Sequence, residues 1–483
     1  MRTLWQPGLI SRVPKSLLVT VAVIGALAMV YLASSRPWYF TSQTYLGGVI
    51  LLELVIAAVC KFRQVFFTLL ILAFLLAGTG LPGSSVGTSA RWLFLAVGGA
   101  VGFLMLLKDR QLRFGMFHAI ALFAVLAATV SALVSRYPGL ALLKALSFFL
   151  LFLYAASGAR LAVRGREARF LAGLLLGCEL LVGSFAVCYL LLGADLMGNP
   201  NSLGAIMSVA AAPVLLWGTL VAQNVSARPR RLFLYALCMY LVYYSHSRAS
   251  MVAAALSCGL LCIGLRRHRT LLAGVGIVLM LIATAMILQP ERVFQTASTV
   301  TSEVVFKGSL ESSLLASRQS PWQEAIDTIN SHFWFGTGFG TTDKGRDASQ
   351  HLGSFSSNSE ATTEYGSSYL EIATWVGILG VLPFFLLLVL LIRRVFRIVL
   401  WMLSGAHPLH PAIPLAMVMV AGMLHAAFED WMFAPGYYLC VFYWSMAFVL
   451  VDVTPSRVPV VDARGVPWLS RLRNVVSAPA SAR

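Results

Sequence analysis

Charged residues are scarce in this chain, and their scarcity excludes a soluble fold. Only 11% of the 483 residues are charged, whereas 59% are hydrophobic. A soluble domain needs a larger polar share to cover its surface. Apolar runs long enough to cross about 30 Å of hydrocarbon recur along the sequence. The sequence therefore predicts an integral membrane protein.

The chain has only seven cysteines, and they lie in or at the ends of apolar runs. None has a CxxC or Cys/His spacing, so no zinc site is indicated. None falls in the longest polar segment, residues 289–366, so no disulfide is indicated there either. The cysteines are interpreted as small hydrophobic residues of the core. An internal repeat is also missing, which favours one membrane domain.

Hydropathy predicts an all-α, polytopic protein with about fourteen transmembrane helices. The first span follows basic residues and has no small-residue cleavage site after it, so we interpret it as an uncleaved anchor. The polar segment 289–366 interrupts the series as one large extracytoplasmic loop that contains short helices. The predicted spans are 16–33, 44–60, 65–81, 92–107, 115–134, 139–159, 170–193, 203–222, 232–246, 249–265, 270–288, 368–391, 411–427 and 434–452.

Basic residues gather in every second loop between the predicted spans. The net charge of +17 therefore indicates membrane topology rather than binding to nucleic acid. With fourteen spans, every basic loop lies on one side, both termini are cytoplasmic and residues 289–366 are periplasmic or extracellular. The predicted organisation is helices 1–11 over residues 1–288, the loop over 289–366, helices 12–14 over 367–452 and a basic cytoplasmic tail over 453–483.

Arg248 lies in a short turn between two predicted spans, on the face where the positive-inside rule disfavours arginine. Ser247 or Ser250 is expected to cap the following helix. A guanidinium group binds phosphate bidentately and stays charged, which favours a phosphate clamp. An interfacial arginine that reaches lipid headgroups is the alternative.

Arg318 precedes Ser320-Pro321-Trp322-Gln323, which is typical of a helix start with a serine cap and a capping box. Arg318 would then lie beside a helix N-terminus, where anions are favoured. An ordinary loop ion pair is the alternative. Downstream, glycines alternate with aromatics in Phe335-Gly336-Thr337-Gly338-Phe339-Gly340. This pattern favours a packed structural turn over a phosphate-binding loop, because it matches neither common phosphate motif.

Further polar groups lie at the predicted ends of later spans. His425, Glu429 and Trp431 follow one another at an external end, where Trp431 is expected either to stack on a sugar or to lie in an aromatic belt. Ionisable residues inside the membrane should face the bundle interior or a wet cavity. Lys144 and Glu371 would border the external face, whereas Glu53 and Glu179 lie deeper and have no predicted role.

Together these motifs resemble the O-antigen ligase and polymerase superfamily of bacterial membrane glycosyltransferases. The order and topology agree over roughly residues 195–450. The motifs that carry the resemblance are Gly198-Asn199-Pro200-Asn201-Ser202-Leu203-Gly204, Ser247-Arg248-Ala249-Ser250, the helix start at 318–322 with the glycine-aromatic turn beyond it, and Ser368-Tyr369-Leu370-Glu371 with Gly377-Ile378-Leu379-Gly380.

The resemblance implies transfer of a glycan from a polyprenyl (undecaprenyl) diphosphate donor, outside the bacterial inner membrane, without a metal or other cofactor. Arg248 and Arg318 match family arginines that are thought to bind the diphosphate. His425, Glu429, Trp431 and Tyr369 are candidates for the acceptor groove. The partners would be the lipid-linked oligosaccharide, a glycan or lipid acceptor, and membrane lipids.

One departure concerns the general base. Ligases of the family carry His-Asn before Tyr-Leu-Glu, whereas this chain has Gly366-Ser367 there. Glu364, Glu360 and His351, all in the same external segment, are possible substitutes.

The departure favours a polymerase, which would lengthen lipid-linked repeats of a surface polysaccharide such as an exopolysaccharide or the O-antigen of lipopolysaccharide. A ligase that attaches glycan to lipid A core or protein is the first alternative. A lipid-linked oligosaccharide flippase or other transporter, and a non-catalytic partner in envelope assembly, are the others.

Overall fold

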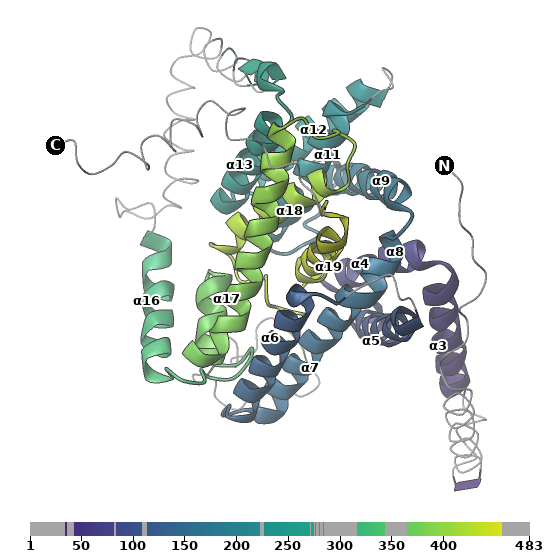
Figure 1. Cartoon of the computed structure of the whole chain (residues 1–483), viewed down its shortest axis with the longest axis vertical. Coiled ribbons are helices and arrows are strands. Elements are labelled where there is room, and N and C mark those ends of the chain that lie inside the picture. Colours follow the sequence, from purple (N-terminus) through teal and green to yellow (C-terminus); the bar gives the residue numbers. More distant parts are fainter. Residues whose placement is uncertain are drawn as a thin grey trace, which may run out of the picture.

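The computed structural model describes residues 34–35, 43–81, 84–108, 114–222, 227–270, 272–274, 276, 280, 284, 316–342 and 365–455. These residues form a helical bundle, and no β-strand occurs among them (Figure 1). The long helix α17 (Ser368–Leu403) packs along α6 (Met116–Leu133) and α18 (Ala412–Ala426). The helix α16 (Ala316–Ser331) lies alongside α17 on the outside of the bundle.

The helices coincide with the apolar runs of the sequence. Of the fourteen predicted spans, 16–33 lies outside the described residues and 270–288 does so for most of its length. The other twelve each fall on one helix or a continuous helical run. The remaining helices are α3 (Gln43–Lys61), α4 (Arg63–Ala77), α5 (Ser84–Lys108), α7 (Pro138–Tyr154) with η1 (Ala155–Ala159) and α8 (Arg160–Val163), α9 (Glu167–Ala186) with η2 (Val187–Leu191), α10 (Pro200–Ala205) with η3 (Ile206–Ala211) and α11 (Ala212–Leu220), α12 (Ala227–Tyr244), α13 (Arg248–Gly264) and α19 (Tyr438–Val453).

Six helical runs among the described residues are long and apolar enough to cross a membrane, and four further apolar helices are shorter. Many large apolar side chains on these helices face outward rather than into the core. An all-α polytopic membrane protein, as the sequence predicts, is therefore confirmed. The count of fourteen stays a prediction.

Two contacts join segments that connect the helices. At the end that we call the site end, the backbone N–H of Gly80 donates to the carbonyl of Leu196 over 2.9 Å. At the same end the hydroxyl of Ser135 donates to the carbonyl of Thr337 over 2.9 Å. Segments that the sequence assigns to the external face are thereby joined to one another.

At the opposite, basic end, buried charges are paired. The guanidinium of Arg160, whose side chain is fully buried, holds Asp452 through two bonds of 2.6 and 2.8 Å. Glu179 accepts from Arg230 over 2.8 Å and from Arg231 over 3.0 Å. Removing one partner of such a pair would leave a buried charge uncompensated. Glu179 is therefore part of the scaffold that joins α9 to α12.

Glu53 corrects one expectation. We expected every ionisable residue within a span to face the bundle interior, yet Glu53 is exposed on the surface of α3. The helix α3 packs on α4 and α5 and lies at the edge of the bundle, away from α16 (Figure 1). One of its faces is therefore not covered by the rest of the described chain.

The helix α17 is interrupted at Gly377, whose φ of 64° and ψ of −176° are not helical. The glycine-aromatic turn fills this interruption. The N–H of Thr337 donates to the carbonyl of Thr374 over 3.0 Å, and that of Gly338 donates to Trp375 over 3.1 Å. Because these amides bond to protein carbonyls, they do not form an anion cradle. The prediction of a packed structural turn is confirmed.

Side chains of α6 and α7 hold the same turn. Ser131 donates its hydroxyl to the carbonyl of Trp375 over 2.5 Å, and the ammonium of Lys144 donates to the carbonyl of Gly340. Lys144 also lies within electrostatic reach of Glu371. Lys144, one of the two residues expected to border the external face, thus helps to seat the turn against the N-terminal half of α17.

Candidate functional site

Arg248 is the first residue of α13, and the local sequence explains its position. His246 has a φ of 50°, which turns the chain sharply after α12. Ser247 then caps α13, because its hydroxyl oxygen accepts the N–H of Ser250 over 3.4 Å. Of the two serines that the sequence offered as caps, Ser247 is the one used. The cap fixes Arg248 at the site end of the bundle.

Arg318 lies inside α16 rather than before it, which corrects the predicted helix start. The helix begins at Ala316 and includes Pro321. Gln323 does not close a capping box, because its amide donates to the carboxylate of Asp327 over 3.0 Å. Proline at the sixth position removes only one backbone bond, close to the helix end, so the helix tolerates it. Arg318 therefore lies within α16.

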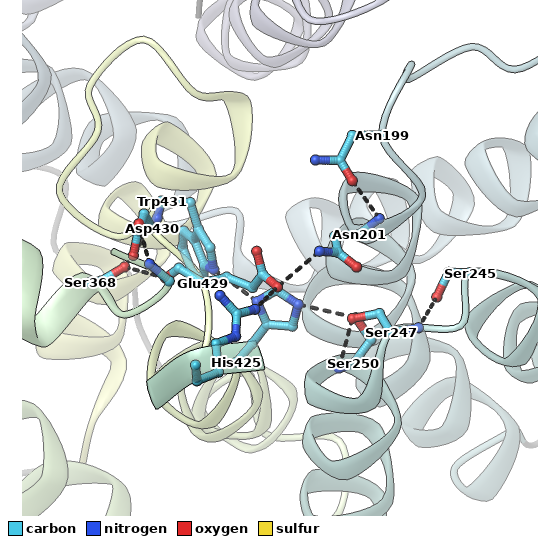
Figure 2. A network of polar contacts seen from close by, with 12 residues as sticks. Asn199, Asn201, Ser245, Ser247, Ser250, Ser368, His425, Glu429, Asp430 and Trp431 are labelled. Carbon is cyan, nitrogen blue, oxygen red and sulfur yellow. Dashed lines mark hydrogen bonds and ion pairs between the residues drawn. The ribbon is translucent and has the colours of Figure 1, made fainter. Parts of the chain in front are cut away.

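The two arginines converge at the site end. Their charges lie close enough for Arg318 to repel that of Arg248. The guanidinium of Arg318 forms an ion pair of 2.9 Å with Oε1 of Glu429, and both side chains are 20% exposed. The same oxygen accepts the amide of Asn201 over 3.1 Å (Figure 2). Glu429 thus links α16 to α10 through one carboxylate oxygen.

Gly366 creates the space that Arg318 occupies. A Cβ at Gly366 would lie 1.8 Å from Nη1 of Arg318, and its φ of 67° also favours glycine. The N–H of Gly366 donates to Oδ2 of Asp430 over 2.6 Å. Where the resemblance leads us to expect a histidine side chain, this chain has the guanidinium of Arg318.

Ser368 clamps the loop that carries Glu429 onto the start of α17. Its hydroxyl donates to the carbonyl of Glu429 over 2.6 Å and accepts the N–H groups of Trp431 and Met432, each over 3.0 Å. The N–H of Ser368 also donates to the carbonyl of Glu429. The loop backbone at Glu429 is therefore fixed relative to α17.

His425 is fully buried and connects this loop to α13. Its Nδ1 accepts the indole N–H of Trp431 over 2.9 Å, and its Nε2 lies 3.0 Å from the hydroxyl of Ser250. Because Nδ1 accepts, a neutral ring carries its proton on Nε2 and donates to Ser250. Ser250 in turn donates to Ser247 over 2.9 Å. Figure 2 shows His425 between the α13 serines and the side chains of the loop.

Trp431 and Tyr369, two further groove candidates, make structural contacts. Trp431 is 3% exposed, and its ring packs edge-on against Tyr443. The hydroxyl of Tyr369 donates to the carbonyl of Met423 over 2.7 Å. Trp431 is therefore buried, whereas Tyr369 is half-buried.

Two general-base candidates, His351 and Glu364, lie outside the described residues, as does Glu360. Among the described residues, Glu429 is the carboxylate paired with a site arginine. No group of three His, Cys, Asp or Glu side chains in the described part of the chain comes together as a metal site would require.

Sequence reasoning missed the roles of Asn201, Gly366 and Ser368. Asn201 belongs to a turn noted in the sequence, but its bond to Glu429 joins residues 228 positions apart. Within that turn, the side chain of Asn199 accepts the N–H of Asn201 over 2.9 Å and caps the start of α10.

Comparison with known families supports the resemblance seen in the motifs. Residues 232–385 match the family model described as O-Antigen ligase. The matched segment includes Arg248, Arg318, the glycine-aromatic turn and the interrupted half of α17. No curated protein shows a significant match to this chain. The segment of residues 232–385 is therefore similar to the O-antigen ligase family, in agreement with the superfamily that the motifs resemble.

Proposed function

We propose that the protein polymerises a surface polysaccharide by transferring glycan from a polyprenyl diphosphate donor to a sugar hydroxyl. The observation that carries the proposal is the convergence of Arg248 and Arg318 from separate helices at one end of the bundle. Two guanidinium groups that meet at one place can each bind one phosphate of a diphosphate. The O-antigen ligase domain, which contains both arginines, supports the same reaction class.

The proposed chemistry places the developing negative charge beside the arginines. The acceptor hydroxyl oxygen attacks the anomeric carbon, the bond from that carbon to the diphosphate breaks, and the electron pair leaves with the polyprenyl diphosphate. Direct displacement inverts the anomeric configuration. Arg248 begins α13, so the N-terminus of that helix adds to the stabilisation of the anion.

The site end would face the periplasm or cell exterior, because the basic loops gather at the other end. A lipid-linked donor reaches such a site from the outer leaflet of the inner membrane. The histidine that ligases of the family carry is replaced by Gly366, and this difference favours a polymerase over a ligase. A ligase would use the same donor site with a different acceptor.

The experiment uses the full chain in lipid nanodiscs with a synthetic polyprenyl-diphosphate oligosaccharide of the cognate repeat, followed by gel analysis and mass spectrometry. A ladder of longer lipid-linked glycans supports the polymerase. Transfer only after addition of lipid A core or a protein acceptor would show a ligase. Unchanged substrate in both conditions, together with movement of the lipid-linked glycan across a sealed bilayer, would show a transporter.

A further inference from the structure

We infer that Glu429 is the general base that accepts the proton of the acceptor hydroxyl, an inference that rests on the proposed transfer reaction. The observation behind it is the Arg318–Glu429 ion pair of 2.9 Å. One arginine of the proposed diphosphate clamp is bonded to a carboxylate. In the proposed reaction, binding of the donor exchanges that partner for phosphate.

The local contacts keep Glu429 ionised, as a base must be. Its Oε1 accepts from both Arg318 and the amide of Asn201. Donors aimed at a carboxylate oxygen favour the charged form. The side chain is 20% exposed, so it is reachable from the site end while most of its surface is covered.

The backbone contacts keep Glu429 in place while its partner changes. Its carbonyl accepts both the N–H and the hydroxyl of Ser368. The next residue, Asp430, accepts the N–H of Gly366 over 2.6 Å. A carboxylate on such an anchored loop stays beside the anomeric carbon of a donor whose diphosphate lies on the arginines. Preorganisation of this kind is what general-base catalysis requires.

The exchange couples donor binding to base strength. A diphosphate carries more negative charge than a carboxylate and accepts bidentately from guanidinium, so it competes well for Arg318. Arg248 and Arg318 are both positively charged and repel each other. Arg248 therefore adds to the attraction of an anion placed between them. Once Arg318 bonds to the diphosphate, Glu429 loses a cationic partner and its affinity for a proton rises. The carboxylate thus becomes a better base when the donor is bound.

The transfer step moves one proton to Glu429 and one electron pair to the leaving group. The acceptor O–H bond breaks and its proton goes to a carboxylate oxygen of Glu429. The acceptor oxygen forms the new bond to the anomeric carbon, and the old bond from that carbon to the diphosphate breaks. The electron pair leaves with the polyprenyl diphosphate. Glu429 then releases the proton to solvent, to which its side chain is partly exposed.

The variants are Glu429→Gln, Arg318→Lys and, as a control, Asp327→Asn, which changes an exposed carboxylate of α16. Each full chain is reconstituted in nanodiscs. Binding is titrated with undecaprenyl diphosphate, which requires no knowledge of the sugar. Transfer is measured as single-turnover rates between pH 5 and 9.

For Glu429→Gln we expect undecaprenyl diphosphate to bind at least as tightly as to wild type, because its competitor for Arg318 has lost its charge. Transfer should fall about 10²- to 10⁴-fold, the usual contribution of a general base. The fall in the wild-type rate at low pH should also disappear. Arg318→Lys should weaken binding about tenfold or more, and Asp327→Asn should keep most of the transfer rate.

Three results would overturn the inference. Transfer by Glu429→Gln within tenfold of wild type would remove its base role. Loss of undecaprenyl diphosphate binding in that variant would show that Glu429 only positions Arg318. An unchanged pH profile would point the same way. Failure of the proposed function is a separate result, in which the wild type neither transfers glycan nor binds undecaprenyl diphosphate.

Discussion

The guanidinium of Arg318 lies where a side chain of residue 366 would be, since a Cβ at Gly366 would come within 1.8 Å of Nη1. The contact joins α16 to the start of α17 and directs Arg318 toward Glu429. The glycine that departs from the ligase pattern therefore shapes the arginine site. The residue at position 366 therefore matters to the proposed donor site as much as the two arginines do.

Gly366→Ala is expected to displace Arg318 and weaken binding of undecaprenyl diphosphate at least tenfold. The φ of 67° adds about 1 kcal/mol of strain in its own right. Gly165→Ala is the matched control, because Gly165 has the same φ of 67° and no atom near its Cβ position. Titration of both variants with undecaprenyl diphosphate separates the displacement of Arg318 from the backbone strain. Equal binding by the two variants would contradict the role given to Gly366.

His425 and Ser250 are expected to act as a unit that positions Arg248. Each single change to alanine should lower the free energy of unfolding by about 1–3 kcal/mol, because it leaves a buried polar group without its partner. The double variant should cost less than the sum of the two, with a coupling energy of about 0.5–3 kcal/mol. Thermal unfolding of the four proteins in nanodiscs measures the coupling. Strict additivity would show that the 3.0 Å contact carries no energy.

Gly336→Ala is expected to destabilise the fold without changing the donor site. A Cβ at Gly336 would lie 2.3 Å from the carbonyl oxygen of Trp375, inside the interruption of α17. Gly436→Ala, with open space at its Cβ position, is the control. Thermal unfolding should shift for Gly336→Ala alone, whereas the folded fraction should bind undecaprenyl diphosphate as wild type does. Lost binding at unchanged stability would instead support a phosphate role for the turn.

The remaining base candidates provide a competition test. Glu364→Gln is expected to slow transfer more than His351→Ala, because a carboxylate is the better substitute for the missing histidine. If Glu429 is the base, both changes should slow transfer less than Glu429→Gln does. Single-turnover rates of the three variants decide the order. A larger loss in either of the first two would move the base role to that residue.

The sequence predicted the helices well because a membrane span is a local property. An apolar run such as residues 115–134 specifies its helix from its own composition. The cap at Ser247 was likewise within reach of a four-residue pattern. The start of α16 was predicted wrongly, because a capping-box pattern at Ser320 was overridden by a helix that begins at Ala316.

The connections of the site were beyond local patterns. The bond of Glu429 to Asn201 spans 228 residues, and that of His425 to Ser250 spans 175. The partners of Glu179 lie 51 and 52 residues away. Such contacts depend on how helices pack, so the sequence could nominate Arg248, Arg318, His425 and Glu429 separately but not join them into one network.

The most direct test of the central claim is the effect of Arg248→Ala and Arg318→Ala on glycan transfer and on undecaprenyl diphosphate binding. Arg136→Ala, an exposed arginine in the loop between α6 and α7, is the control. Each site variant should lose product and binding while its level in the membrane stays unchanged, and the control should retain both. Normal transfer by both site variants would contradict the diphosphate clamp.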